Sequence, residues 1–183
     1  MAVREVHFSD PFAGVRAGDL DLAVLWRPVR EADLTEGPVV FTEGRLPAVG
    51  TGHELAGRTA VTLEDFGGQT CVGVGPDVPG YWMESMVPAR TPGGRPVARG
   101  PVVSTFHEVL HTVSSGQAVS PLNEHVVQYY SHPGIVLLPV VDAPPTEWAL
   151  VWRTGDLHPR ARALVDLAAA LGPHSYAAPG VEP

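Results

Sequence analysis

The amino-acid sequence predicts a mixed α/β protein. Short apolar runs alternate along the 183 residues with segments in which apolar residues recur at helical spacing. Hydrophobic residues make up 44% of the chain, which is enough to bury a core and excludes a chain that is disordered throughout. The 20 glycines and 19 prolines indicate many turns and short elements. This length corresponds to one domain or to two small lobes.

In the first half of the chain, the alternating residues 3–8 predict a strand. Asp10 and Pro11 predict the start of a short helix, because Asp caps helices and Pro fits their first position. The apolar run at residues 20–26 predicts a second strand, buried on both faces if it lies mid-sheet. Further along we expect a strand or a broken pair of strands at residues 39–41 and 45–49, a helical turn at 62–66, a strand at 71–74 and a helix at 79–87.

The second half contains the clearest helical pattern, which begins at a cap provided by Ser104 or Thr105. Its apolar residues share one face of the helix and form a buried stripe: Phe106, Val109, Leu110 and Val113. Before this helix, the Pro- and Gly-rich residues 88–100 predict a loop or hairpin. After it we expect strands at residues 118–122, 135–141 and 148–153, a helix from Asn123 to residue 130, a helix at Pro159–Leu171 and a frayed tail at 175–183.

The charge and the apolar pattern exclude several classes of function. The chain carries 12 basic residues, all of them arginine, against 20 acidic residues, which gives a net charge of −8. Because the arginines are scattered and duplex binding needs a clustered positive surface, we expect no nucleic-acid partner. The longest apolar run is broken by Pro139 and is too short to span a membrane, and the first residues lack the apolar core of a secretory signal. A lone Cys71 suits a reducing compartment, so we expect a cytoplasmic protein with no membrane partner.

Four segments carry a family resemblance. Residues 17–24 are similar to a G-x-L-D-L-A-I strand motif, and residues 53–58 with 63–66 are similar to an H-P-L-A-x-R … L-x-D-L motif. Residues 104–121 are similar to a helix–glycine–strand–proline run, and residues 148–153 followed by Pro159–Leu171 are similar to a returning strand and closing helix. In this order and spacing, over residues 3–172, the chain resembles the effector-binding (substrate-binding) domain of LysR-type transcriptional regulators.

The resemblance implies two Rossmann-like lobes with a small-molecule cleft between them, which is the periplasmic-binding-protein type II-like architecture. Lobe one would comprise residues 1–46 and 147–183, and lobe two residues 47–146. Such regulators begin with a helix-turn-helix, and a strand and a helix of their effector domain precede the segment that matches residues 3–8. We find neither in this sequence, so we expect an N-terminally truncated domain with lobe one incomplete.

The absent first strand would leave residues 20–26 with an open apolar edge, and such an edge invites another chain. One possibility is that residues 3–8 take the position of the absent strand beside residues 20–26. The other is that two chains exchange their N-terminal segments or pair edge to edge. We expect the first arrangement together with a homodimer, because the effector domains of the family commonly pair side by side.

The residues expected to bind ligand lie where the resemblance places strand ends and a helix start beside the cleft: Trp26, Arg27, Ser104, Thr105, Phe106, Ser120 and Pro121. Arg27 offers a bidentate fork to a ligand carboxylate, and pairing with a neighbouring acid is the alternative. Ser104 and Thr105 open a helix whose free N–H groups favour an anion, and simple capping is the alternative. We therefore expect a small anionic or aromatic metabolite in the cleft and no cofactor.

Residues 107–111 match the pattern H-E-x-x-H, which places His107 and His111 on one helix face with Glu108 beside them. Zinc needs a third ligand, and the longer metalloprotease pattern fails because Ser114 stands in place of glycine, so we expect no metal. We predict a stand-alone effector-binding domain that binds its metabolite without contacting DNA and senses it, sequesters it or modulates a partner regulator. The alternative is a cofactor-independent cyclase or condensing enzyme of a biosynthetic pathway, with these three residues as acid–base groups.

Overall fold

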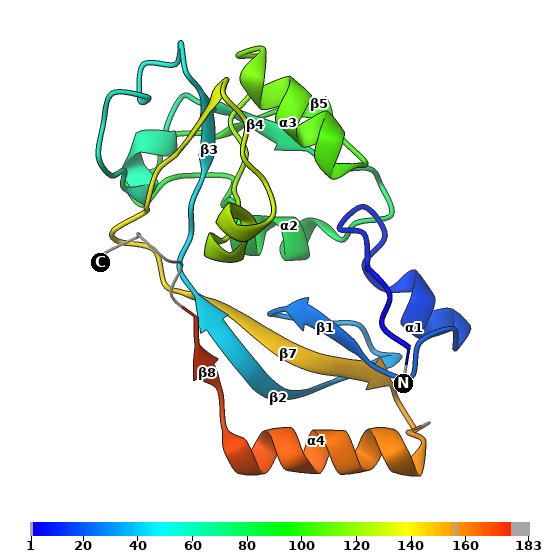
Figure 1. Ribbon diagram of the computed structural model, residues 1–183. Helices are drawn as coiled ribbons and strands as arrows, with labels where there is room; N and C mark the ends of the chain where they lie inside the picture. The colour runs from blue at the N-terminus through cyan, green and yellow to red at the C-terminus, as the bar shows by residue number, and fades with distance from the viewer. Residues whose placement is uncertain (1, 156, 177–183) are drawn as a thin grey trace.

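The computed structural model describes residues 2–155 and 157–176 (Figure 1). Within these residues, four strands form one sheet in the order β1, β7, β2, β8. Their bounds are Ala23–Trp26 for β1, Thr146–Arg153 for β7, Leu34–Glu43 for β2 and His174–Ser175 for β8. β7 pairs antiparallel with β1 and β2, and β8 pairs parallel with β2. β1 therefore lies at one edge of this sheet.

In the described part of the chain, three α-helices pack against this sheet: α1 (Ala13–Ala17), α2 (Gly80–Met86) and α4 (Pro159–Leu171). On one face, Val15 of α1 and Trp82 of α2 share a buried cluster with Leu25 of β1. On the other face, Val165 of α4 packs against Trp152 of β7, and Figure 1 shows α4 lying along that side of the sheet. Because β7 is covered on both faces, its sequence is almost continuously apolar.

The chain between β2 and β7 forms two short ladders. β3 (Ala48–Gly50) pairs antiparallel with β6 (Ile135–Leu137), and β4 (Thr70–Gly73) pairs parallel with β5 (Ala98–Val102). Single bridges from residue 119 to 71 and from residue 120 to 48 join the two ladders. Besides α2, the helical segments of this region are η1 (Leu63–Phe66), α3 (Phe106–Ser114) and η2 (Glu124–Gln128).

Local signals set where these helices begin and end. Thr105 caps α3, and Val109 and Val113 on the predicted stripe are buried against the ladders. Gly50 of β3 allows α3 to approach closely, because a Cβ atom at this position would lie 2.8 Å from the carbonyl oxygen of Val113. α4 has the predicted bounds and ends at Gly172, whose φ of 71° favours glycine.

The N-terminal segment departs from the prediction. Residues 3–8 form no strand, so the expected slide of this segment into a slot beside β1 is not observed. α1 begins at Ala13 and has five residues, which is shorter than the crossover that adjacent parallel strands require. In Figure 1 the N-terminal segment rises away from the sheet before it returns to α1. Among the described residues, the edge of β1 opposite β7 therefore carries no strand.

Other elements differ in length or type. The helix expected from Asn123 to residue 130 is the 3₁₀ segment η2, and the strand expected at residues 118–122 is reduced to the two single bridges. β2 begins at Leu34, earlier than expected, and its pairing with β7 shifts register between Glu36 and Val39, where Gly37 and Pro38 interrupt the ladder. Residues 177–183 of the predicted tail lie outside the described residues. No helix in the described ranges is long and apolar enough to cross a membrane.

Candidate functional site

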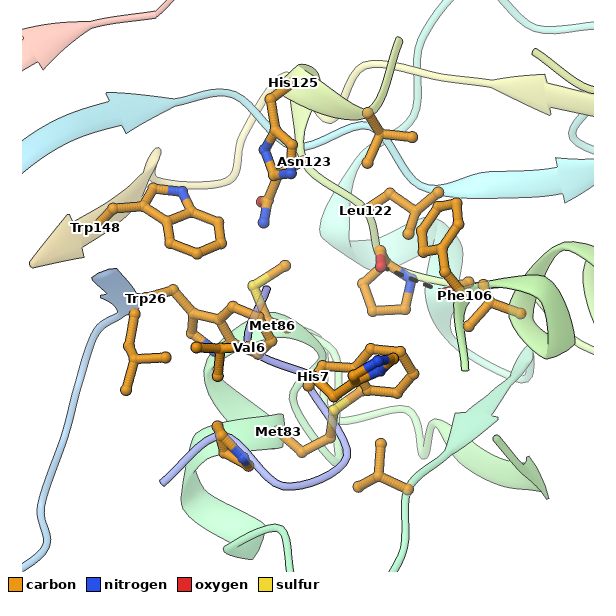
Figure 2. A pocket seen from close by; sticks show the side chains of 18 of the residues that line it. Val6, His7, Trp26, Met83, Met86, Phe106, Leu122, Asn123, His125 and Trp148 are labelled. Carbon is orange, nitrogen blue, oxygen red and sulfur yellow. Dashed lines mark hydrogen bonds between the residues drawn. The ribbon is translucent and has the colours of Figure 1, made fainter. Parts of the chain in front are cut away.

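A cavity of about 500 Å³ lies where the four-stranded sheet meets the ladder region (Figure 2). The N-terminal segment, β1, β4, α2, α3, η2 and β7 all contribute residues to its lining. Most lining residues are aliphatic, aromatic or methionine. The polar or titratable side chains of the lining belong to Glu5, His7, Ser120, Asn123, His125, Tyr129 and Tyr130. A cavity of this size, apolar with a few polar groups, is typical of a small-molecule site.

Three tryptophans form one wall of the cavity. Trp26 and Trp82 stack with their ring centroids 3.5 Å apart, and Trp148 meets Trp26 edge-on at 5.6 Å. The register between β1 and β7 places Trp26 directly opposite Trp148. Each indole N–H has an acceptor within the chain: the carbonyl oxygen of Trp82 at 3.4 Å, that of Trp26 at 3.0 Å and the carboxylate of Glu43 at 2.5 Å. Trp82 is fully buried, so Trp26 and Trp148 are the tryptophans that offer ring surface to a ligand, and none of the three offers a free donor.

A buried carboxylate lies behind this wall. Glu43 ends β2, and its side chain is 0% exposed. Its oxygens accept hydrogen bonds from the backbone N–H of His125 at 2.8 Å, from Nδ1 of His125 at 2.8 and 3.0 Å, and from the Trp148 indole. Because an ionised carboxylate only accepts, Nδ1 of His125 carries the proton of this contact, and Nε2 is the ring nitrogen that Glu43 leaves unoccupied. Figure 2 shows the His125 ring beside Trp148 at one end of the cavity.

Two more polar side chains line the cavity. Asn123 precedes η2 and is buried, and its Oδ1 accepts a hydrogen bond from Thr146 Oγ1 at 2.8 Å. Its amide nitrogen has no hydrogen-bond partner among the described residues. Ser120 is also buried, and its hydroxyl makes one long contact of 3.4 Å with the carbonyl oxygen of Pro121. These groups are available to a ligand.

Two titratable groups outside the lining have perturbed pKa values. Burial raises the pKa of the Cys71 thiol to about 12, so this cysteine is not an activated nucleophile. Burial lowers the pKa of Arg45, whose guanidinium donates a hydrogen bond to the carbonyl oxygen of Met86 at 3.2 Å.

The structure brings together some of the sequence-predicted ligand residues. Trp26, Phe106, Ser120 and Pro121 line the cavity. Arg27 does not line it and instead donates hydrogen bonds to Glu36 at 2.6 Å and to Glu147 at 2.7 Å. The bond to Glu36, followed by that to Glu147, raises the pKa of Arg27.

Ser104 and Thr105 also lie outside the lining. Thr105 Oγ1 accepts the backbone N–H of Glu108 at 3.2 Å, and the Glu108 carboxylate accepts the backbone N–H groups of Ser104 at 2.6 Å and Thr105 at 3.3 Å. This reciprocal capping satisfies three N–H groups at the start of α3, so the chain itself supplies the anion that the helix start favours.

The alternative catalytic residues His107, Glu108 and His111 are exposed on α3 and lie outside the cavity lining. Glu108 is committed to the capping contacts. Within the described ranges, no three His, Cys, Asp or Glu residues gather to hold a metal ion.

Sequence reasoning missed the polar end of the cavity. The sequence pattern predicts Asn123 only as a helix cap, and it predicts no ligand contact for His125 or Trp148. A signal was present, because Asn123 and His125 lie two and four positions after Pro121 in the sequence. Glu43 lies far from them in the sequence, so its role behind His125 depends on tertiary contacts.

The LysR substrate binding domain family model matches residues 1–172. The effector binding domain of QuiR in complex with shikimate is similar in structure, with a TM-score of 0.67 and 15% identity, over 90% of this chain and 77% of that one. The oxidized form of OxyR has a TM-score of 0.67 and 23% identity, over 93% of this chain and 80% of that one. HinK, a LysR family transcriptional regulator from Pseudomonas aeruginosa, has a TM-score of 0.60 and 20% identity, over 92% of this chain and 59% of its own. No curated protein sequence matches the chain.

Proposed function

Because the chain belongs to the family of LysR substrate binding domains, we propose that it binds a small molecule in the cavity beside Trp26, Trp148 and His125. Its mixed α/β fold is that of LysR effector-binding domains, which are periplasmic-binding-protein type II-like. The observation that carries the proposal is a 500 Å³ cavity with aromatic walls, at which the amide nitrogen of Asn123 has no hydrogen-bond partner among the described residues.

The cavity supports a cleft between two lobes, with lobe one at residues 1–46 and 147–183 and lobe two at residues 47–146. Trp26 and Trp148 would then belong to lobe one, and Phe106, Ser120 and His125 to lobe two. The domain of QuiR binds shikimate, which is a precedent for a ligand of this size in a related fold. For this chain, the aromatic walls favour the aromatic side of the expected ligand class.

In this proposal the chain binds its ligand without contacting DNA, and it senses or sequesters the ligand or modulates a partner regulator. The net charge of −8 supports the first part, because phosphate contacts need positive charge. The proposed location is the cytoplasm, supported by the buried free Cys71. The proposed assembly is a homodimer, supported by the open edge of β1.

The enzymatic alternative has no specific observation in its favour. Its residues His107, Glu108 and His111 are exposed and lie outside the cavity. A general acid or base must reach the reacting group, directly or through one water.

The indole N–H signals of the tryptophans in nitrogen-resolved NMR test the proposed site. Trp26 and Trp148 line the cavity, whereas Trp152 packs under α4 and serves as an internal control. We expect at least one of shikimate, benzoate, methyl benzoate and benzamide to shift the Trp26 and Trp148 signals in a saturable way and to leave Trp152 unchanged. If none of these probes shifts the two signals, or if Trp152 shifts equally, the proposed site is wrong.

A further inference from the structure

The polar end of the cavity presents a hydrogen-bond donor beside an acceptor. Asn123 and His125 are two residues apart, and Figure 2 shows their side chains next to each other at this end. Oδ1 of Asn123 is occupied by Thr146, which leaves the amide N–H₂ group as a donor. Nδ1 of His125 is occupied by Glu43, which leaves Nε2 as the ring nitrogen for a ligand, and Nε2 accepts a hydrogen bond when the ring is neutral. The contacts behind the cavity thus fix which atom of each side chain faces a ligand.

The charges around this end do not favour an anion. No arginine belongs to the lining among the described residues, and Arg27 and Arg45 bond to other groups of the chain. The buried Glu43 carboxylate is adjacent to His125 and would repel a ligand carboxylate across the ring. Glu5 adds an acidic side chain within the lining itself.

The polar atoms of the lining also set a requirement on the ligand. A buried donor or acceptor that loses water without gaining a partner is costly, so a ligand that fills the cavity must pair with both Asn123 and His125. The flat faces of Trp26 and Trp148 lie beside them and suit an unsaturated ring. An aromatic carboxamide or lactam meets both requirements, because its C=O and N–H groups stand side by side on one edge.

We infer that the ligand of this cavity is an uncharged aromatic molecule with a carboxamide or lactam edge, whose C=O accepts from Asn123 and whose N–H donates to His125. This inference rests on the proposed function and names the chemical class of its ligand. The Glu43 contact is essential to it, because that contact holds the His125 ring with Nε2 free.

Three matched probes separate charge from hydrogen-bond donation. Benzamide has the complete edge, methyl benzoate keeps the carbonyl acceptor without the N–H donor, and benzoate is the anion of similar shape. We expect benzamide to bind about tenfold more tightly than either of the others at mildly alkaline pH, measured by titrating the Trp26 and Trp148 indole signals. A site built to pair with a donor discriminates strongly against an analogue that lacks it.

Two variants assign the contacts. His125→Asn keeps a side-chain N–H for Glu43 and removes Nε2, so the preference for benzamide over methyl benzoate should fall to less than about twofold. His111→Asn, an exposed change on α3, is the matched control and should keep the full preference. Asn123→Asp keeps an acceptor for Thr146 and removes the N–H₂ donor, so it should weaken benzamide and methyl benzoate alike.

The outcomes are distinct. If benzoate or methyl benzoate binds as tightly as benzamide, or if His125→Asn keeps the preference for benzamide, the inferred ligand class is wrong while the cavity remains a binding site. If shikimate shifts the cavity tryptophans and benzamide does not, the class is again wrong. If no probe shifts them, the class and the proposed function both fail. Should either variant fail to fold, as judged by circular dichroism, the comparison of the three probes on the unaltered chain still decides.

Discussion

Arg27 and Glu43 carry opposite charges on the same sheet, and their surroundings give them different roles. The Arg27 side chain is 41% exposed and is held by two carboxylates, one of them 120 positions away in the sequence. The Glu43 side chain is fully buried and accepts three N–H groups at the cavity wall. The residue type of Arg27 favours an anionic ligand, and this is why the sequence predicts Arg27 as a ligand residue. The sequence does not indicate that the Arg27 guanidinium donates a hydrogen bond to Glu147, because that contact depends on how β7 returns to β1.

Replacing Glu43 by glutamine should destabilise the protein. The isosteric change turns one carboxylate oxygen into an N–H₂ group, which leaves a buried donor of His125 or Trp148 without an acceptor. We expect the free energy of unfolding to fall by about 1–3 kcal/mol, measured by urea denaturation. Glu147→Gln is the matched control: its side chain is exposed, and it should cost less than about 1 kcal/mol. Equal losses in both variants would contradict the role given to the buried carboxylate.

Replacing Arg27 by alanine should affect stability slightly and ligand binding not at all. Its ion pairs with Glu36 and Glu147 are exposed, so we expect the free energy of unfolding to fall by no more than about 1 kcal/mol. The affinity for benzamide or another probe that shifts the Trp148 signal should stay within about twofold. Binding that weakens by about tenfold would place Arg27 in the ligand site, as the sequence predicted.

At the scale of elements, the sequence predicts best where the signal is local. The bounds of α4 follow from Pro159 and Gly172, and the start of α3 follows from Thr105 and its apolar stripe. Prediction fails where long-range contacts decide. Residues 3–8 alternate like a strand but do not pair with the open edge of β1, and residues 118–120 form single bridges because β3 and β4 approach them from two sides.

The short element η1 has a testable pH dependence. Hydrogen bonds from the backbone and hydroxyl of Thr62, together with Arg58, lower the pKa of Asp65 from its ordinary value of 3.8. A lowered folded-state pKa contributes stability that is complete above the ordinary value and is lost as the pH falls through the folded value. We expect Asp65→Asn to cost about 0.5–1 kcal/mol near neutral pH and less at about pH 2, measured by urea denaturation at both pH values.

Asp77→Asn is the control for this experiment. Asp77 is exposed and has no hydrogen-bond partner among the described residues, so its replacement should have little effect at either pH. A cost of Asp65→Asn that is unchanged in acid would mean that the charge of this residue does not stabilise η1.

At the scale of the whole molecule, the candidate site forms where segments that are far apart in the sequence meet. Four of the seven predicted ligand residues line the cavity, and they come from β1, from α3 and from the bridge region after it. The polar end needs more than these segments. Glu43, His125 and Trp148 lie on β2, η2 and β7, which meet only because the chain leaves the four-stranded sheet after β2 and returns to it at β7. Local sequence patterns do not encode such a meeting, so the cavity walls were partly predictable and its polar end was not.

The open edge of β1 tests the proposed homodimer. Arg27 and Leu25 lie at positions that bond to β7, so the N–H group of Val24 points away from β7, and the Val24 side chain is 42% exposed. Pairing of two β1 edges across a two-fold axis would give the Val24 N–H group an acceptor and would cover the Val24 side chain. We therefore expect sedimentation at micromolar concentration to show a dimer.

Val24→Pro removes the outward N–H group and is tolerated on an edge strand, so this variant should sediment as a folded monomer. Val24→Thr keeps the N–H group and the β-branched shape, and it should remain dimeric. A monomer for the unaltered chain would reject the homodimer. A dimer that survives Val24→Pro would place its interface elsewhere, because an edge that has lost its central donor cannot continue the ladder into a second copy.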